Sequence, residues 1–139
     1  MFFLDTNIIS ELRLAAKGKG DANVLAWAQC YEKTLFYTNV VVMMELERGI
    51  LNIERKDHQQ AQALTRWLER TVKPTFEQRI FPIDSATASI CAGLHVPDRA
   101  PENDAWIAAS AIQYDLTLVT RNHKDFAHLG VRLYNPFLS

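Results

Sequence analysis

The sequence has few of the residues that build thiolate metal sites or disulfide frameworks. Its only two cysteines, Cys30 and Cys91, lie far apart and show no CxxC spacing. We therefore expect neither a zinc site nor a disulfide, and we interpret both side chains as buried free thiols. The four histidines show no HxH or HExxH spacing. We interpret them as surface or packing residues.

Strong charge and long hydrophobic runs are also missing. The formal net charge is −1, so the chain has no overall attraction for nucleic acid, and any such contact must come from local patches. The longest uncharged stretch, LFYTNVVVMM, is far shorter than the roughly 20 residues of a membrane span. No basic segment followed by an apolar core marks a signal peptide. We expect a soluble, cytoplasmic protein that does not associate with membranes.

The residues that are present indicate one ordinary globular domain. The chain has 139 residues, 48% of them apolar and 22% charged, without repeats or low-complexity linkers. We expect one domain over residues 1–139. Strand patterns are expected at 1–5, 35–38, 79–83, 116–120 and 131–135, and helical patterns at 9–16, 24–32, 40–52, about 55–71, 86–94 and 105–114. This alternation predicts an α/β fold with a mostly parallel sheet and helices on both faces.

Polar residues at the expected helix starts predict caps. These are Asp21 for the second helix, Thr38 or Asn39 for the third, Asp84 or Ser85 for the helix over 86–94, and Asn103 or Asp104 for the helix over 105–114. The segment RNHKDF is expected to be a turn.

Two carboxylates stand where an apolar side chain would be expected. Asp5 ends the first apolar run, where it is either a helix cap or a site residue, because sites in such sheets lie at the carboxyl ends of strands. Glu45 shares a helical face with Val41 and Val42, so it faces the core or a cleft. A salt bridge to a helical arginine is the alternative for Glu45, whereas Glu47 is interpreted as a surface charge.

Two further acids follow later in the chain. Asp104 starts a helix with a wholly apolar face, where it is either a first-turn acid or a site residue. Asn122 and Asp125 follow the strand at 116–120, and each alone is typical of a turn. Acids gathered at one end of a sheet repel one another unless a cation lies between them. Carboxylate oxygens suit Mg²⁺ or Mn²⁺, so we interpret Asp5 as a metal ligand more than a cap.

The ordered motifs LDTN, MMELERG, NDAWIAASA and LVTRNHKDF resemble those of the PIN-domain ribonucleases. The segment LDTNIISEL and the terminal YNPF make the chain most similar to the VapC/FitB-type toxins of bacterial toxin–antitoxin pairs. The resemblance covers essentially the whole chain. It implies an α/β/α PIN domain and a metal-dependent endoribonuclease that cleaves transfer RNA or another structured RNA. Asp5, Glu45 and Asp104 match the acidic ligand positions of the family.

The resemblance leaves the fourth acidic position open. The family often has an aspartate where this chain has Asn122, and Asp125 is the alternative source of that charge. Residues expected to support the cluster are Thr6, Asn7 and Thr120. Possible phosphate contacts are Arg48, Arg121 and Lys124, with Arg13, Lys17 and Lys19 as further cations around the cleft.

The resemblance also implies partners: a homodimer, and an antitoxin that blocks the cleft and tethers the pair to operator DNA. The amphipathic helix around Trp67 is interpreted mainly as core packing, with an interface as the alternative. Three other functions remain open. They are a PIN nuclease of RNA maturation, a catalytically impaired PIN domain that binds RNA or a partner, and a doubly wound phosphotransfer domain. The last usually has a second acid beside the first, which DTN lacks.

Overall fold

The computed structural model describes residues 1–138 and contains a parallel sheet at its centre. Within these residues the sheet has five strands in the order β3-β2-β1-β4-β5, and every neighbouring pair is parallel. The strands are β1 (Phe2–Leu4), β2 (Phe36–Asn39), β3 (Ile80–Phe81), β4 (Thr117–Val119) and β5 (Leu133–Tyr134). Each overlaps an expected strand, so the predicted α/β fold is confirmed.

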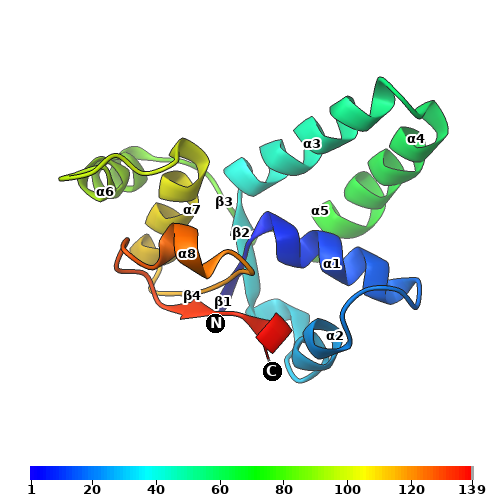
Figure 1. Cartoon of the computed structure of the whole chain (residues 1–139), viewed down its shortest axis with the longest axis horizontal. Coiled ribbons are helices and arrows are strands. Elements are labelled where there is room, and N and C mark those ends of the chain that lie inside the picture. Colours follow the sequence, from blue (N-terminus) through cyan, green and yellow to red (C-terminus); the bar gives the residue numbers. More distant parts are fainter. Residues whose placement is uncertain (139) are drawn as a thin grey trace.

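Helices connect the strands and cover the sheet. They are α1 (Thr6–Ala16), α2 (Ala22–Gln29), α3 (Val40–Glu54), α4 (His58–Trp67), α5 (Lys73–Thr75), α6 (Ser85–Leu94), α7 (Glu102–Gln113) and α8 (His123–Phe126). A π-helical turn at Leu68–Val72 joins α4 to α5. Short 3₁₀ turns occupy Lys33–Leu35 and Pro136–Leu138. Figure 1 shows α3 and α4 as a hairpin reaching away from the sheet, with α6 and α7 on the opposite side.

Three predicted caps are confirmed by hydrogen bonds. Asp21 accepts from the N–H groups at 23 and 24, Asn39 from the N–H of Val42, and Asp84 forms a capping box with Thr87. Asn39 therefore ends β2 and starts α3 directly. This cap favours a helix at the valine-rich start of α3, despite the β propensity of valine.

Three predicted boundaries are wrong. α7 begins at Glu102 after Pro101, so Asn103 and Asp104 lie in its first turn instead of capping it. α4 begins at 58 because Asp57 accepts a hydrogen bond from the N–H of Gln60, whereas a start near 55 was expected. The expected turn at 121–126 contains the single helical turn α8.

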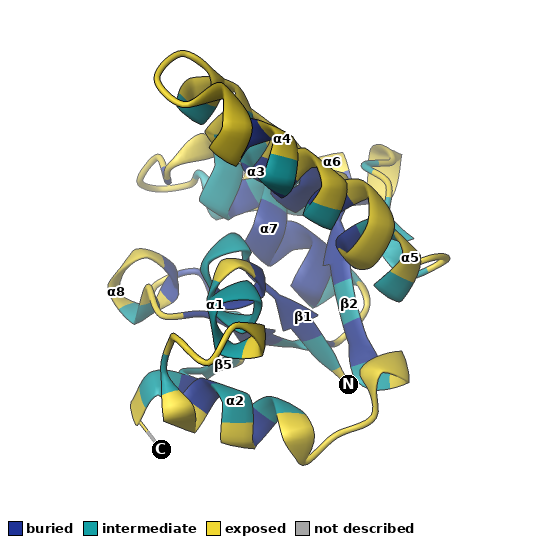
Figure 2. Cartoon of the chain, turned by 90° about the vertical axis from the view of Figure 1, so that its right-hand side faces the viewer, coloured by how far each residue is buried: buried dark blue, intermediate teal, exposed yellow. Residues whose placement is uncertain are grey.

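The core surrounds the sheet, with contributions from α1, α2, α3, the 68–76 segment and α7. Figure 2 shows β1, β2 and α7 as its buried centre, while α2, α3 and α4 present exposed outer faces. Small side chains at 105, 108, 109 and 111 are fully buried, which lets the backbone of α7 approach the sheet closely. Cys91 is buried as predicted, but Cys30 is exposed because it lies at the exposed end of α2. Among the residues described, no helix is long and apolar enough to cross a membrane.

The strand order locates the site. From β1 the chain builds β2 and β3 on one side of that strand and later β4 and β5 on its other side. The direction of winding therefore changes at β1, and ligands of such sheets bind beside the carboxyl ends of the strands at this point. Asp5 follows β1 there, and Thr120 follows β4.

Candidate active site

Asp5 is a helix cap and a buried carboxylate at the same time. Its Oδ1 accepts a hydrogen bond from the N–H of Thr6 at 2.7 Å and caps α1. Its Oδ2 accepts from Thr120 Oγ1 at 2.8 Å and from Asn7 Nδ2 at 3.1 Å. Burial raises the pKa of Asp5 above its usual value; hydrogen bonds from Thr120 and Thr6 oppose this rise, and the charge of Glu45 adds to it. The cap interpretation is thus confirmed, and it leaves the ligand interpretation open.

Glu45 lies half-buried on α3 and is fixed from two directions. Thr6 Oγ1 donates to Glu45 Oε1 at 2.5 Å, and Asn103 Nδ2 donates to Oε2 at 3.3 Å. No ion pair involves Glu45 within residues 1–138, so the salt-bridge alternative is wrong. Glu47 is exposed and pairs with Lys73 at 3.3 Å, which confirms it as a surface charge. The contact between Asn103 and Glu45 is not predicted by the sequence. Its one indication there is that Asn103 directly precedes Asp104.

Asp104 shows that the carboxylates share one region. It lies half-buried in the first turn of α7. Its pKa is raised to about 6, first by burial and then by the negative charges of Asp5, Asp125 and Glu45. Thr6, next to Asp5, and Asn103, next to Asp104, both bond to Glu45, so these three acids lie in one region, and like charges there repel one another.

The loop after β4 is bonded to the loop after β1. Thr120 is fully buried, and its Oγ1 accepts from Asn7 Nδ2 at 3.3 Å and from the N–H of Asn122 at 3.0 Å. The N–H of Arg121 donates to Asn7 Oδ1 at 3.0 Å. The predicted supporting residues Thr6, Asn7 and Thr120 therefore all contact the cluster. Asn122 and Asp125 are exposed at α8.

The donor set fits a hydrated hard cation. Among the residues that the structure describes, no three Asp, Glu, His or Cys side chains form a ready set of ligands around one point. The acids of the cluster nevertheless offer carboxylate oxygens and neither imidazole nor thiolate. Mg²⁺ keeps several waters and takes only one or two protein carboxylates directly, so it does not require a closed cage. The residues present therefore fit Mg²⁺ or Mn²⁺ and do not fit zinc.

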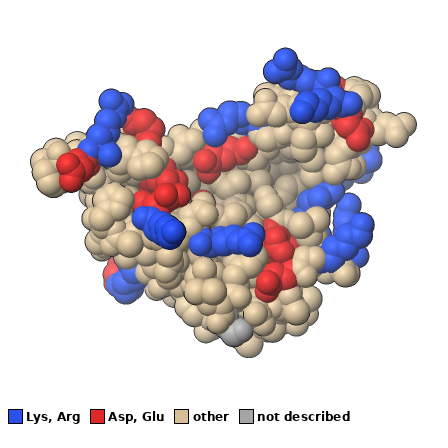
Figure 3. Space-filling model, viewed as in Figure 1, with Lys and Arg blue, Asp and Glu red and all other residues tan. Residues whose placement is uncertain are grey.

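Cations surround the cluster unevenly. Arg48 is exposed on α3 about one turn after Glu45, and Arg121 and Lys124 are exposed after β4. Figure 3 shows acidic and basic side chains mixed around the hollowed middle of this face. Arg13 and Lys17, expected around the cleft, instead border a groove on another part of the molecule.

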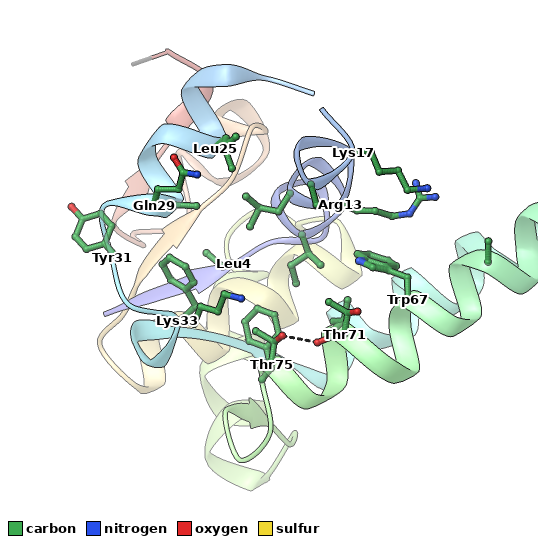
Figure 4. Close-up of a pocket in the computed structure, with 18 residues that line it drawn as sticks. Leu4, Arg13, Lys17, Leu25, Gln29, Tyr31, Lys33, Trp67, Thr71 and Thr75 are labelled. Carbon is green, nitrogen blue, oxygen red and sulfur yellow. Dashed lines mark hydrogen bonds between the residues drawn. The ribbon is translucent and has the colours of Figure 1, made fainter. Parts of the chain in front are cut away.

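This groove lies between α1, α2 and the α4–α5 segment and has a volume of about 570 Å³. Its lining is mostly apolar and includes Leu4, Ile9, Leu12, Leu25, Ala28, Trp67, Val72 and Phe76. Arg13, Lys17 and Lys33 are its charged residues, and it has no acid in its lining (Figure 4). Leu68 belongs to the hydrophobic core, and Trp67 packs against the core as predicted but also lines the groove.

Comparison with known proteins identifies the family. The model of the PIN domain matches residues 2–131. The chain belongs to the PIN-domain family. The predicted family resemblance is confirmed, and the phosphotransfer alternative is wrong. PIN ribonucleases are metal-dependent enzymes.

Two relatives and two solved structures resemble this PIN domain over nearly its whole length. Toxin FitB of Neisseria gonorrhoeae is 32% identical over 99% of both chains. A VapC ribonuclease of Sinorhizobium fredii is 28% identical over 99% of this chain and 98% of the relative. The crystal structure of FitAcB from Neisseria gonorrhoeae has a TM-score of 0.88 at 29% identity, with 99% of both chains covered. FitAB bound to a DNA fragment has a TM-score of 0.87 at 27% identity, covering 99% of this chain and 96% of that chain.

Proposed function

We propose that this chain is the ribonuclease toxin of a toxin–antitoxin pair, a metal-dependent endoribonuclease that acts in the cytoplasm. One PIN domain, residues 1–139, carries the activity. The observation that supports this most is the cluster of Asp5, Glu45 and Asp104 at the carboxyl end of the sheet. It occurs in a chain that is similar to toxin FitB over 99% of its length.

Asp5, Glu45 and Asp104 would hold Mg²⁺ or Mn²⁺, and Asp125 would supply the fourth acid. The effect of Asp125 on the pKa of Asp104 supports this choice over Asn122, which contributes an amide near the same site. A bound cation supplies a water of lowered pKa and stabilises negative charge on the scissile phosphate.

The side chains of this protein have three tasks in the reaction. Thr6, Asn7 and Thr120 hold the carboxylates in place through the hydrogen bonds described above. Arg48, Arg121 and Lys124 bind phosphates of the RNA backbone, which fixes the strand without reading its bases. Hydrolysis breaks one P–O ester bond and adds the elements of water across it, with transfer RNA or another structured RNA as the substrate.

The apolar groove supports the partner part of the proposal. An antitoxin segment with apolar and acidic side chains would fill it, because the lining is apolar and the charged residues at its border, Arg13, Lys17 and Lys33, are all cationic. The FitAB structure contains DNA. By that similarity, two copies of this chain assemble with the antitoxin on operator DNA.

Incubation of purified, antitoxin-free protein with end-labelled transfer RNA tests the activity. With Mg²⁺ or Mn²⁺ we expect discrete cuts that disappear in EDTA and on addition of the antitoxin. Cutting that persists in EDTA would contradict metal dependence. Metal binding without cutting over a broad RNA panel would instead favour the catalytically impaired binding domain, with Asn122 as its cause. Absence of toxicity on expression would favour a PIN nuclease of RNA maturation.

A further inference from the structure

Arg121 is the cation whose backbone is attached to the acidic cluster. It follows Thr120, which donates to Asp5, and its own N–H donates to Asn7 Oδ1 at 3.0 Å. Asn7 also donates to Asp5 at 3.1 Å. The backbone at 121 is therefore fixed relative to the proposed metal ligands before any substrate binds.

The guanidinium of Arg121 contacts an aromatic ring and, among the described residues, forms no ion pair. Its Cζ lies 4.6 Å from the centre of the Phe137 ring. Within residues 1–138 no carboxylate lies at ion-pair distance from Arg121. An arginine that stacks on a ring by its face keeps its in-plane N–H donors free, and these donors match the oxygens of a phosphate.

The terminal turn holds the ring of Phe137 in place. The N–H of Phe137 donates to Asn135 Oδ1 at 3.0 Å, and Asn23 Nδ2 on α2 donates to the carbonyl of Phe137 at 3.2 Å. Pro136 is buried, and the Phe137 side chain packs against the core. The position of the ring is thus set by the fold and does not depend on the side chain of Arg121.

We propose that Phe137 is a positioning residue for RNA binding, which makes the YNPF turn part of the substrate site. Its ring restricts the side chain of Arg121, whose backbone is bonded to Asn7, and the guanidinium held there binds an RNA backbone phosphate. Restricting the side chain in advance lowers the entropy that is lost on binding. This inference rests on the proposed function, since it assigns a role in binding the RNA substrate. In the part of the chain that the structure describes, Lys124 has no such ring contact, and it contributes only general attraction.

A double-mutant cycle tests the proposal by fluorescence anisotropy with a short fluorescein-labelled RNA of mixed sequence, in EDTA at low salt. We expect Arg121→Ala to weaken RNA binding and to lower the slope of log K against log salt by about one. Phe137→Leu should weaken binding about threefold, in the range of an exposed cation–π contact. The matched variant Phe137→Tyr keeps the ring and should bind RNA like wild type. In the Arg121→Ala background, Phe137→Leu should have no further effect.

A second variant covers the case in which Phe137→Leu does not fold. Arg121→Lys keeps the charge and leaves the turn intact, but loses the stacked planar group. It should weaken RNA binding as much as Phe137→Leu does. Equal losses for Phe137→Leu in both backgrounds, or Arg121→Lys binding like wild type, would overturn the proposal.

The binding assay is independent of RNA cleavage. If the wild type cuts RNA with Mg²⁺ but the two residues are not coupled, only this inference fails. If coupling is found in a protein that does not cut, the proposed activity fails and the binding role of Phe137 stands. Wild-type protein that binds no RNA in this assay would overturn the inference.

Discussion

The acidic end of the sheet and the apolar groove are built in opposite ways, although both use α1. The first residues of α1, Thr6 and Asn7, bond to the carboxylates, while Ile9 and Leu12 line the groove. At the acidic end Asp5 and Glu45 accept hydrogen bonds on both carboxylate oxygens, and the negative charges of the acids repel one another. The groove instead leaves apolar surface exposed to solvent. The first region thus fits a cation, and the second fits a protein partner.

The largest effect is expected when one proposed metal ligand is removed from the acidic end of the sheet. Glu45→Gln should lower RNA cleavage with Mg²⁺ by at least about a hundredfold, because it removes a negatively charged ligand of the proposed cation. Glu47→Gln removes the same charge two residues away on the exposed face of α3, and should cleave like wild type. Cleavage rates on one labelled RNA compare the two. Equal rates for both variants would contradict the assignment of Glu45.

A charge placed in the groove should separate binding of the antitoxin from catalysis. Leu25 is half-buried in the groove, and Leu25→Glu should weaken antitoxin binding about thirtyfold, the effect of one central interface residue. Leu51→Glu introduces the same charge at an exposed leucine outside the groove. Calorimetric titration with antitoxin measures both variants, and free Leu25→Glu should cleave RNA normally. Loss of affinity in Leu51→Glu alone would place the antitoxin elsewhere.

Removal of a supporting hydroxyl should have a smaller effect. Thr120→Val keeps the shape but loses the hydrogen bond to Asp5 and the acceptor for the N–H of Asn122. Mn²⁺ affinity should fall about tenfold, as for other groups that orient metal ligands. Thr117→Val in β4 is the control, because among the residues described the hydroxyl of Thr117 bonds only to Arg132. Unchanged Mn²⁺ affinity in Thr120→Val would contradict the supporting role.

The pH dependence of stability should show the smallest effect. The pKa of Asp104 rises from its ordinary value of 3.8 in the unfolded chain to about 6 in the fold. Between these values the folded state binds more protons, so the free energy of unfolding of the metal-free protein falls as pH rises from 3.8 to about 6. Solvent screening of this half-exposed group reduces the loss to about 1 kcal/mol. Asp5, whose pKa is also raised, adds a change of the same sign.

Urea unfolding of wild type and Asp104→Asn across this pH range measures the contribution. The variant should be the more stable protein above pH 6 and should differ least at the acid end. A variant that is less stable than wild type throughout the range would show that the carboxylate stabilises the metal-free fold, contrary to this account.

The acidic end could be predicted from the sequence because its signals are local. Asp5 interrupts an apolar run, Glu45 occupies an apolar helical face, and Asp104 opens an apolar helix. Each is a charged residue at a position where the hydrophobic periodicity predicts an apolar one. The parallel sheet brings the start of α1 and the loop after β4 together, whereas Thr120 is predicted as a supporting residue only through the resemblance to the PIN-domain family.

The groove and the contacts of Asn103 and Phe137 could not be predicted from the sequence, because they depend on packing between segments that are distant along the chain. Asn103 reaches Glu45 across 58 residues of sequence. Phe137 reaches Arg121 through a turn whose position is fixed by α2. Arg13 and Lys17 were assigned to the wrong region because charge alone does not show which end of α1 meets the cleft. Cys30 was predicted to be buried because thiols usually are, whereas the end of α2 is exposed.

Mn²⁺ binding by calorimetry, on protein first dialysed against EDTA, tests the central claim most directly. The proteins compared are wild type, Asp104→Asn and the control Glu102→Gln. Glu102 is an exposed acid in the same turn of α7 and pairs with Arg99. We predict equal Mn²⁺ affinity for wild type and Glu102→Gln, and at least about tenfold weaker binding for Asp104→Asn, with RNA cleavage lost in parallel. Equal Mn²⁺ binding by all three proteins, or no binding by wild type, would contradict a metal centre at the acidic end of the sheet.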